Sequence, residues 1–231
     1  MFSTCAFCGD PCDRRGICAP CIEVLPGNNV HCERCGRPLA AAQPDGVPCA
    51  DCQLRPPPYR KARAPYVYEF PLDAAIKAMK FRRQLFFLPP LAALLEATLA
   101  AEFGDCDLLV PVPLHRYRHA LRGYNQAREL ARELAKRAAL PVFDGVRRVR
   151  ATRPQAGLSR LRRRRNLANA FAPGLPLPGR HPLIVDDVIT TGATAEQLAA
   201  VLVSSGADTV SVLAVAAARD GTNVAQGVVN V

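Results

Sequence analysis

The sequence predicts an α/β protein, with a parallel sheet covered by helices and a small cysteine-rich module before it. Two observations predict this class. Continuously apolar segments alternate with helical segments over most of the chain, a pattern typical of parallel sheets covered on both faces. Nine of the ten cysteines lie in the first 52 residues. We therefore expect a cysteine-rich domain over residues 1–58 and an α/β domain over residues 59–231.

The expected elements of the α/β part follow a proline-rich, basic segment, "RPPPYRKARAP" at Arg55–Pro65. We expect this segment to be a stiff linker, with the domain boundary near Pro58. Continuously apolar stretches predict buried strands at 106–113, 181–187 and 208–217, and weaker patterns predict short strands at 66–70 and 145–150. Helical periodicity predicts helices at 71–84, 88–104, 124–140 and 194–206, and a helical turn at 161–168.

The chain is basic. Its 231 residues include 30 lysines and arginines against 20 acidic residues, a net charge of +10. This balance predicts an anionic partner without choosing among nucleic acid, polyphosphate and acidic lipid. Nine arginines and no acid lie between Arg147 and Arg165. This stretch is open to three interpretations: a solvated loop, a lid that meets pyrophosphate, or a nucleic-acid surface, although it lacks aromatic residues for stacking on bases.

The N-terminal segment, "MFSTCAFCGD", has neither the basic nor the apolar region of a signal peptide. We also expect no apolar run of about 18 residues, and hence no membrane span. A cytoplasmic location follows as the expectation. In that reducing compartment, cysteines favour metal binding over disulfides.

Eight of the cysteines form four CxxC pairs, and two such pairs can complete a tetrahedral shell around Zn²⁺. We therefore expect two structural zinc ions. Pairing of neighbouring motifs closes shorter loops than interleaved pairing and is favoured for that reason. The expected ligands are Cys5, Cys8, Cys18, Cys21, Cys32, Cys35, Cys49 and Cys52. Cys12 and His31 are expected to be bystanders. Metal binding should supply most of the folding energy of this segment.

The most informative stretch of the α/β part is "LIVDDVITTGAT", Leu183–Thr194. Its threonines and glycine precede a helix, where backbone N–H groups and the helix dipole suit a phosphate dianion. The adjacent carboxylates of Asp186 and Asp187 cannot share that phosphate, but they suit neutral hydroxyls. A ligand with a vicinal diol near a phosphate meets both demands, and ribose 5-phosphate is such a ligand.

This stretch resembles the signature of type I phosphoribosyltransferases, which bind 5-phosphoribosyl 1-pyrophosphate (PRPP). The segments "VPVPLHRYRHALRGYNQARELA" and "RPQAGLSRLRRRRNLANAF" resemble motifs of the ComF family, the competence-related phosphoribosyltransferase-like proteins. The four CxxC pairs resemble the double zinc ribbon of that family. The resemblance covers nearly the whole chain, up to Arg219, and implies the type I phosphoribosyltransferase fold.

The resemblance also implies site residues. Asp186 and Asp187 should hold the ribose hydroxyls, directly or through Mg²⁺. The 5′-phosphate should lie in a loop formed by Thr190, Thr191, Gly192, Ala193 and Thr194. Arg116, with Arg118 behind it, should contact pyrophosphate, and Arg122 belongs to the family's R-G-[FY]-N-Q stretch. Gln155 and Arg163 match the family's pattern in a hinged loop over the site.

The implied reaction is Mg²⁺-dependent displacement of pyrophosphate from PRPP by an acceptor that the sequence does not identify. Thr190 stands where purine-using relatives have an acidic residue, so no general base is evident. The alternative is a non-catalytic module that senses PRPP or binds single-stranded DNA in a DNA-uptake system. Single-stranded DNA and proteins of the competence machinery are the partners that the resemblance implies. His115 and His119 are expected to be loop residues rather than proton carriers.

Overall fold

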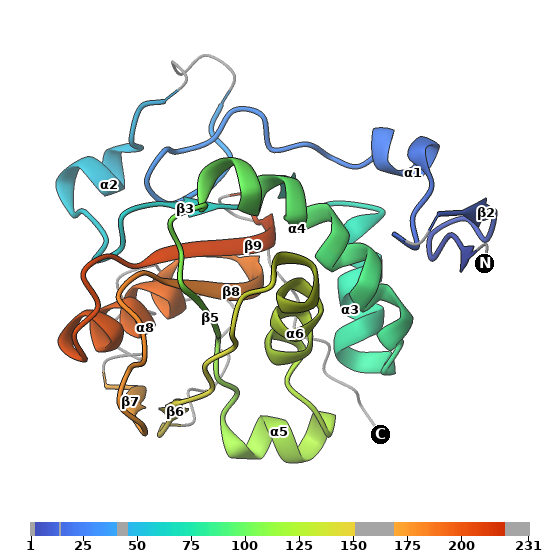
Figure 1. Ribbon diagram of the computed structural model, residues 1–231. Coiled ribbons are helices and arrows are strands. Elements are labelled where there is room, and N and C mark those ends of the chain that lie inside the picture. The colour runs from blue at the N-terminus through green and yellow to red at the C-terminus, as the bar shows by residue number, and fades with distance from the viewer. Residues whose placement is uncertain (1–2, 14, 41–45, 151–168, 220–231) are drawn as a thin grey trace.

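The computed structural model describes residues 3–13, 15–40, 46–150 and 169–219 (Figure 1). Among these residues, five strands form a central sheet in the order β3-β9-β8-β5, with β4 also paired to β9. Every pairing in this sheet is parallel. The strands are β3 (Ala62–Arg63), β4 (Tyr66–Val67), β5 (Leu108–Pro111), β8 (Pro182–Ile189) and β9 (Ser211–Ala217). The predicted α/β class with a parallel sheet is confirmed.

Strand β8 is longer than the sequence predicted, because it continues past the acid pair to Ile189. Val188 and Ile189 still pair with Ala216 and Ala217 of β9. On the other side, β5 ends opposite Val185. The acid pair therefore lies within β8, one and two residues beyond its last partner on β5.

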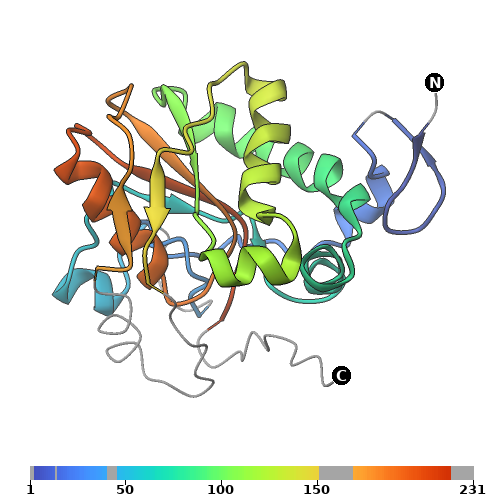
Figure 2. The same ribbon diagram turned by 90° about the horizontal axis from the view of Figure 1, so that it is seen from below.

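The sheet separates two apolar cores (Figure 2). Leu183 and Val185 of β8 pack into the core that contains α3, α4 and α6, whereas Ile184 between them packs into the core that contains α8. This alternation is expected for a strand that is covered on both faces. The helices are α3 (Leu72–Arg82), α4 (Leu88–Glu102), α6 (Gln126–Ala138) and α8 (Ala193–Ser204).

Three short elements lie near the carboxyl end of the sheet. One of them, β6, falls within the weak strand predicted at 145–150, and the other two were not predicted. Helix α5 (Arg116–Arg122) begins at His115, whose Nδ1 accepts a hydrogen bond of 3.3 Å from the backbone N–H of Tyr117. Strands β6 (Val146–Arg148) and β7 (Phe171–Pro173) pair antiparallel. The expected helical turn at 161–168 lies outside the described residues.

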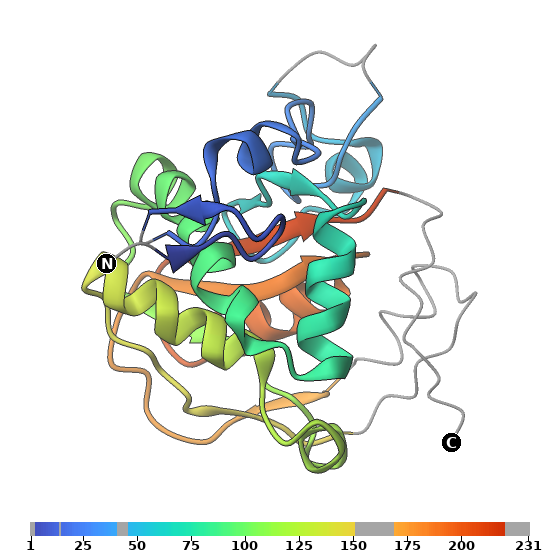
Figure 3. The ribbon, with the colours of Figure 1, turned by 90° about the vertical axis from the view of Figure 1, so that its right-hand side faces the viewer.

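The N-terminal part packs directly on the α/β part (Figure 3). It contains β1 (Ser3–Thr4), β2 (Pro11–Cys12), α1 (Ala19–Glu23) and α2 (Ala50–Leu54). Cys5 and Ile17 belong to the same apolar core as α3 and α4, and the Phe7 ring meets the Phe87 ring edge-on at 5.5 Å. The two parts thus share one core.

The end of the expected linker is part of the sheet. Ala62 and Arg63 form β3, which pairs with β9, and the backbone N–H of Ala62 donates to the carbonyl of Arg34 at 2.8 Å. The Asn28 side chain donates to the carbonyl of Ala64 at 2.9 Å. These residues are therefore held on both sides by backbone contacts. The domain boundary near Pro58 stays a prediction.

One apolar helical segment corrects the expectation that no such run exists. Within the described residues, the 18 residues of Leu85–Glu102 are long and apolar enough to cross a membrane by length and composition. This segment consists of a 3-10 turn, η1 (Leu85–Phe87), followed by α4. Leu91, Leu95 and Leu99 of α4 are buried against α6 and the sheet. In this fold the segment is a core helix.

Candidate functional site

The eight CxxC cysteines form two clusters. Within each cluster the sulfur atoms of four cysteines lie within 4.8 Å of one another. The first contains Cys5, Cys8, Cys18 and Cys21, and the second contains Cys32, Cys35, Cys49 and Cys52. Neighbouring motifs therefore pair, as predicted, and the interleaved alternative is wrong. Four thiolates at this spacing fit the tetrahedral shell of a structural Zn²⁺.

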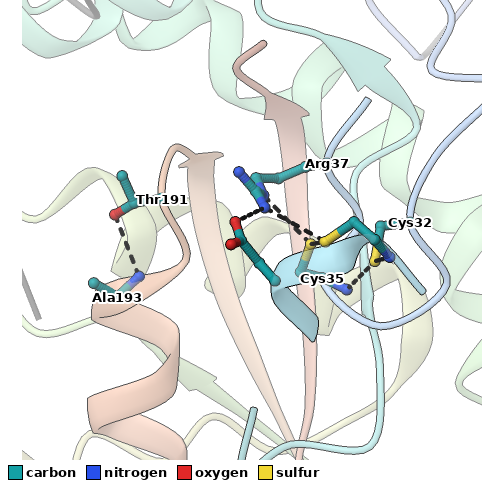
Figure 4. A network of polar contacts seen from close by, with 7 residues as sticks. Cys32, Cys35, Arg37, Thr191 and Ala193 are labelled. Atoms are coloured by element: carbon teal, nitrogen blue, oxygen red, sulfur yellow. Dashed lines mark hydrogen bonds and ion pairs between the residues drawn. The ribbon is translucent and has the colours of Figure 1, made fainter. Parts of the chain in front are cut away.

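The second cluster is buried and contacts a buried arginine (Figure 4). Arg37 is only 5% exposed. Its guanidinium donates from Nε to the sulfur of Cys35 at 3.4 Å and from Nη2 to the sulfur of Cys49 at 3.5 Å. Nη2 also lies 3.1 Å from Oδ2 of Asp51. The sequence analysis did not identify Arg37, which follows the first CxxC turn of this cluster, Cys32–Cys35, by two residues.

The first cluster is more open to solvent. Cys8 is exposed, and Cys18 and Cys21 are half-buried. The carboxylate of Asp10 lies 3.4 Å from the sulfur of Cys8. Among the described residues neither Cys12 nor His31 belongs to either cysteine cluster.

The acid pair lies on β8, and its two carboxylates have different surroundings. Asp187 is 3% exposed. Its Oδ1 lies 2.9 Å from Nζ of Lys80 on α3, and its Oδ2 is buried with no hydrogen-bond partner among the described residues. Asp186 is half-buried and accepts a hydrogen bond of 2.9 Å from the backbone N–H of Asp187. Lys80 was missed by the sequence analysis.

Burial and the neighbouring carboxylate change the protonation of this site. Burial, followed by the charge of Asp187, raises the pKa of Asp186 to about 7, against the opposing effect of Lys80. Burial raises the pKa of Tyr124 and of Tyr68, and the negative charge of Asp187 contributes to both shifts. The two tyrosines therefore lie within electrostatic range of the Asp187 carboxylate.

The threonine-rich turn joins β8 to α8. Gly192 is the N-terminal cap of α8 with a φ of +77°, and Thr191 Oγ1 accepts a hydrogen bond of 3.5 Å from the backbone N–H of Ala193 (Figure 4). Thr190 and Thr194 are half-buried on either side. A Cβ atom added at Gly192 would lie 3.5 Å from the hydroxyl of Tyr59, so the turn approaches the segment before β3. The turn therefore combines hydroxyls with the N-terminus of a helix.

The predicted arginines lie on α5. Arg116 is exposed, whereas Arg118 and Arg122 are half-buried. Burial, then the charge of Arg122, lowers the pKa of Arg118. Burial, then the charge of Arg118, lowers the pKa of Arg148 on β6 to about 10, against the opposing effect of Asp186. Arg148, which the sequence analysis singled out only as part of the arginine-rich stretch 147–165, thus lies within electrostatic range of both α5 and the acid pair.

Two predicted site residues, Gln155 and Arg163, lie outside the described residues.

The stretch "RGYNQ", residues 122–126, connects α5 and α6 to their surroundings. The Tyr124 hydroxyl donates to the carbonyl of Met79 on α3, and Arg83 Nε donates to the carbonyl of Arg122 at 3.1 Å. The Asn125 amide donates to the carbonyl of Val112, the residue that follows β5, at 3.0 Å. The stretch therefore fastens α5 and α6 to the helix that carries Lys80.

These features define an α/β protein with a parallel sheet and two Cys₄ centres suited to zinc. No family model matches the chain. The chain is 36% identical over 203 residues to the DNA utilization protein YhgH of Escherichia coli strain K12, covering 85% of this chain and 88% of that protein. It is 33% identical over 217 residues to competence protein F of Haemophilus influenzae, covering 89% and 92%.

A more distant relative is competence protein ComFC of Bacillus subtilis, 26% identical over 200 residues, with 82% of this chain and 79% of that protein covered. The identities to YhgH and to competence protein F both exceed 30% over most of each chain, which shows membership of the same family. The chain belongs to the ComF family of competence and DNA utilization proteins.

Proposed function

We propose that this chain is a PRPP-binding, phosphoribosyltransferase-like protein that serves DNA uptake or utilisation. One observation carries the proposal. The acid pair of β8 and the threonine-lined start of α8 belong to one strand-to-helix connection, separated only by Val188 and Ile189. Groups suited to hydroxyls and groups suited to phosphate are therefore presented a few residues apart, as a ribose 5-phosphate unit requires.

The phosphate half of the proposed site rests on α8. The first backbone N–H groups of a helix have no partner within the helix, and the helix dipole favours an anion there. Gly192 allows a close backbone approach, and Thr190, Thr191 and Thr194 supply hydroxyls. Ala193, at the first position of α8, adds a backbone N–H.

The pyrophosphate half rests on the cationic side chains of α5 and β6. Arg118 and Arg122 on α5 and Arg148 on β6 lie within electrostatic range of one another or of Asp186. Arg116, Gln155 and Arg163 are further proposed contacts. Mg²⁺ would be held by pyrophosphate oxygens and would neutralise charge on the leaving group. The arginines would stabilise that charge from fixed positions.

The proposed chemistry is transfer of the phosphoribosyl group to an unidentified acceptor with release of pyrophosphate. The relatives of this chain are DNA utilization and competence proteins, which supports a role in DNA uptake or utilisation. Single-stranded DNA or a protein of the competence machinery is therefore the proposed partner, and the cytoplasm the proposed location.

The second candidate is a non-catalytic module that senses PRPP or binds single-stranded DNA. Two observations favour it. Thr190 provides no carboxylate that could act as a general base. Tyr117 and Leu121, one turn apart on α5, are 66% and 69% exposed beside the arginines of the same helix. An exposed aromatic ring among arginines is the combination on which single-stranded nucleic acid stacks.

Pyrophosphate release separates the two candidates. The zinc-loaded protein is incubated with PRPP and Mg²⁺, alone and with pools of nucleobases, amines or single-stranded DNA. Release that depends on one pool identifies both the enzyme and the class of its acceptor. Binding of PRPP without release in every pool favours the module. The absence of any calorimetric or NMR response to PRPP contradicts both forms of the proposal.

Asp187→Asn tests the acid pair itself. Loss of a hydrogen bond to a charged group costs about 1.5–3 kcal/mol, so PRPP affinity should fall roughly 10- to 100-fold. Zinc content should stay at two ions per chain, because Asp187 belongs to neither cysteine cluster. Asp208→Asn is the control, since it removes a solvent-exposed carboxylate that pairs with Arg180 at 3.1 Å. An unchanged affinity in Asp187→Asn would remove the acid pair from the site.

A further inference from the structure

The acid pair has a counter-ion built into the fold. Nζ of Lys80 lies 2.9 Å from Oδ1 of Asp187, with side-chain exposures of 12% and 4%. The ion pair joins helix α3, which carries Lys80, to strand β8 of the central sheet, which carries Asp187. Solvent therefore does little to screen it.

The position of Lys80 on α3 explains why the ammonium group is buried. Ile76 and Met79 face the core and are fully buried. Lys80 follows Ile76 by four residues, which places its side chain near the same face of the helix. An unpaired ammonium group in such surroundings costs several kcal/mol, so the residue needs the carboxylate of Asp187.

This ion pair changes the charge that the acid pair presents to a ligand. Even when both carboxylates are ionised, the ammonium of Lys80 reduces their charge of −2 to −1, and protonation of Asp186 reduces the negative charge further. A divalent cation held by both carboxylates would lie close to that ammonium and be repelled. Neutral hydroxyls do not meet this repulsion. Moreover, Oδ2 of Asp187 is a buried acceptor with no hydrogen-bond partner in the described part of the chain, and a ligand hydroxyl is a donor of the kind it lacks.

We propose that Lys80 is a positioning residue that takes the place of a divalent cation at the acid pair, so that Asp186 and Asp187 bind sugar hydroxyls directly. Mg²⁺ then accompanies only the pyrophosphate of a ligand. The identity of the sugar ligand rests on the proposed function. The exclusion of a divalent cation rests on the ion pair alone.

Mn²⁺, followed by electron paramagnetic resonance, tests the exclusion without a sugar ligand. As long as Lys80 is present, the single variant Asp186→Asn should bind Mn²⁺ to the same extent as the wild-type protein. Lys80→Met should create a new Mn²⁺ site, with affinity raised by about tenfold or more and lost again on adding Asp186→Asn. Lys80→Arg keeps a cation and should create no site. Lys77→Met is the matched control, because Lys77 lies on the same helix but pairs with Asp73 at 2.6 Å.

Ribose 5-phosphate, followed by calorimetry, tests direct binding of the hydroxyls. Mg²⁺ is omitted rather than chelated, since a chelator would also remove zinc. The wild-type affinity should be the same with and without Mg²⁺, whereas Lys80→Met should bind the sugar phosphate only when Mg²⁺ is present. Inorganic phosphate should bind the wild type and Lys80→Met with equal affinity. This control excludes a general loss of structure in the variant, because such a loss would also weaken phosphate binding.

Two results overturn the inference: a wild-type Mn²⁺ site that Asp186→Asn abolishes, or wild-type ribose 5-phosphate binding that requires Mg²⁺. Neither result requires a variant of Lys80, so both decide the question even where Lys80→Met does not fold. In that case Lys80→Gln replaces Lys80→Met in the measurements above. A wild-type protein that responds to neither ribose 5-phosphate nor PRPP instead removes the proposed function, and the Mn²⁺ measurements still decide the role of Lys80.

Discussion

The guanidinium of Arg37 lies 3.4 Å from the sulfur of Cys35, inside the second cysteine cluster. A Zn²⁺ ion bound by four thiolates carries a net charge of −2, and a buried arginine that donates to two of those sulfurs offsets part of it. In the first cluster the charged neighbour is instead a carboxylate, that of Asp10 beside Cys8. Among the described residues, the charged side chain that contacts sulfur is thus cationic at the second centre and anionic at the first.

Arg37→Met should weaken zinc retention at the second centre. Loss of a group that hydrogen-bonds to metal ligands typically reduces metal affinity by about 10- to 100-fold. Zinc release to a colorimetric chelator should therefore show a faster phase for the second centre in the variant. Arg34→Met is the control, because Arg34 donates to the carbonyl of Arg60 on the exposed side of the same module. Equal release from wild type and Arg37→Met would contradict the role of the arginine.

Asp186→Asn should stabilise the folded protein while harming ligand binding. Burial and Asp187 raise the pKa of Asp186 to about 7, above the ordinary value of 3.8. The folded state then holds the proton more tightly than the unfolded state, so the wild type loses stability as pH rises from about 4 to about 7. Asparagine does not titrate. The stability of the variant relative to the wild type should therefore increase over this pH range and remain increased at pH 8. Each kcal/mol of difference should raise the Tm of the variant by about 2–4 °C.

Thermal unfolding at pH 5, 6, 7 and 8 measures this difference. Asp105→Asn is a control of opposite sign, because its hydrogen bonds with Arg60, at 2.6 and 2.8 Å, lower the pKa of Asp105. That variant should be slightly less stable, by the same amount at each of these pH values, which all lie above the ordinary pKa of aspartate. A stability difference for Asp186→Asn that does not grow with pH would show that the proton is not held in the folded state.

The sequence predicted those parts of the site whose residues are neighbours in the chain. The acid pair, the threonine-rich turn and the CxxC motifs are local patterns, and their local geometry follows from strand, turn and helix rules. Tertiary packing brings Lys80 into contact with Asp187 and Arg148 within electrostatic range of Asp186, and no local pattern records this packing. One signal for Lys80 was present: a lysine four residues after Ile76 continues the apolar face of a predicted helix, and a lysine there needs an anionic partner.

The fold shows the same limit. Long periodic segments such as α6 and continuously apolar strands such as β9 were predicted to within a few residues. The residues of β3 were interpreted as linker, because prolines and basic residues dominate that segment. These residues form a strand because they pair with β9 and contact the backbone of Arg34, and neither contact can be inferred from composition. Helix α5 has only seven residues and follows prolines, so it is too short for periodicity to reveal.

Asn125→Ala should destabilise the protein by about 1–3 kcal/mol. The side chain is 8% exposed and makes two hydrogen bonds. Its Oδ1 caps α6 by accepting from the N–H of Ala127 at 3.1 Å, and its Nδ2 donates to the carbonyl of Val112 at 3.0 Å. Urea unfolding measures the loss. Asn125→Asp keeps the capping acceptor but turns the donor into an acceptor against the Val112 carbonyl, so it should also destabilise the protein. Unchanged stability in Asn125→Ala would show that neither hydrogen bond is a stabilising contact.

Gly192→Ala should reduce phosphate binding beyond its effect on stability. Gly192 has a φ of +77°, in the left-handed region, where a residue with a Cβ atom costs about 1–2 kcal/mol. The added Cβ would be in ordinary contact with the Tyr59 hydroxyl at 3.5 Å, so no severe clash adds to this cost. However, the methyl group would stand at the N-terminus of α8, where the proposed phosphate approaches the backbone. Titration with inorganic phosphate and PRPP should therefore show weaker binding.

Gly206→Ala separates the two effects, because Gly206 has a φ of +100° and no atom within 4 Å of an added Cβ. It lies beyond the opposite end of α8, after Ser204. Both variants pay the conformational cost of a left-handed residue and should lower Tm to a similar degree. Only Gly192→Ala should lose affinity for phosphate and PRPP, since only its methyl group lies at the helix N-terminus. Equal ligand affinities in the two variants would place the phosphate elsewhere.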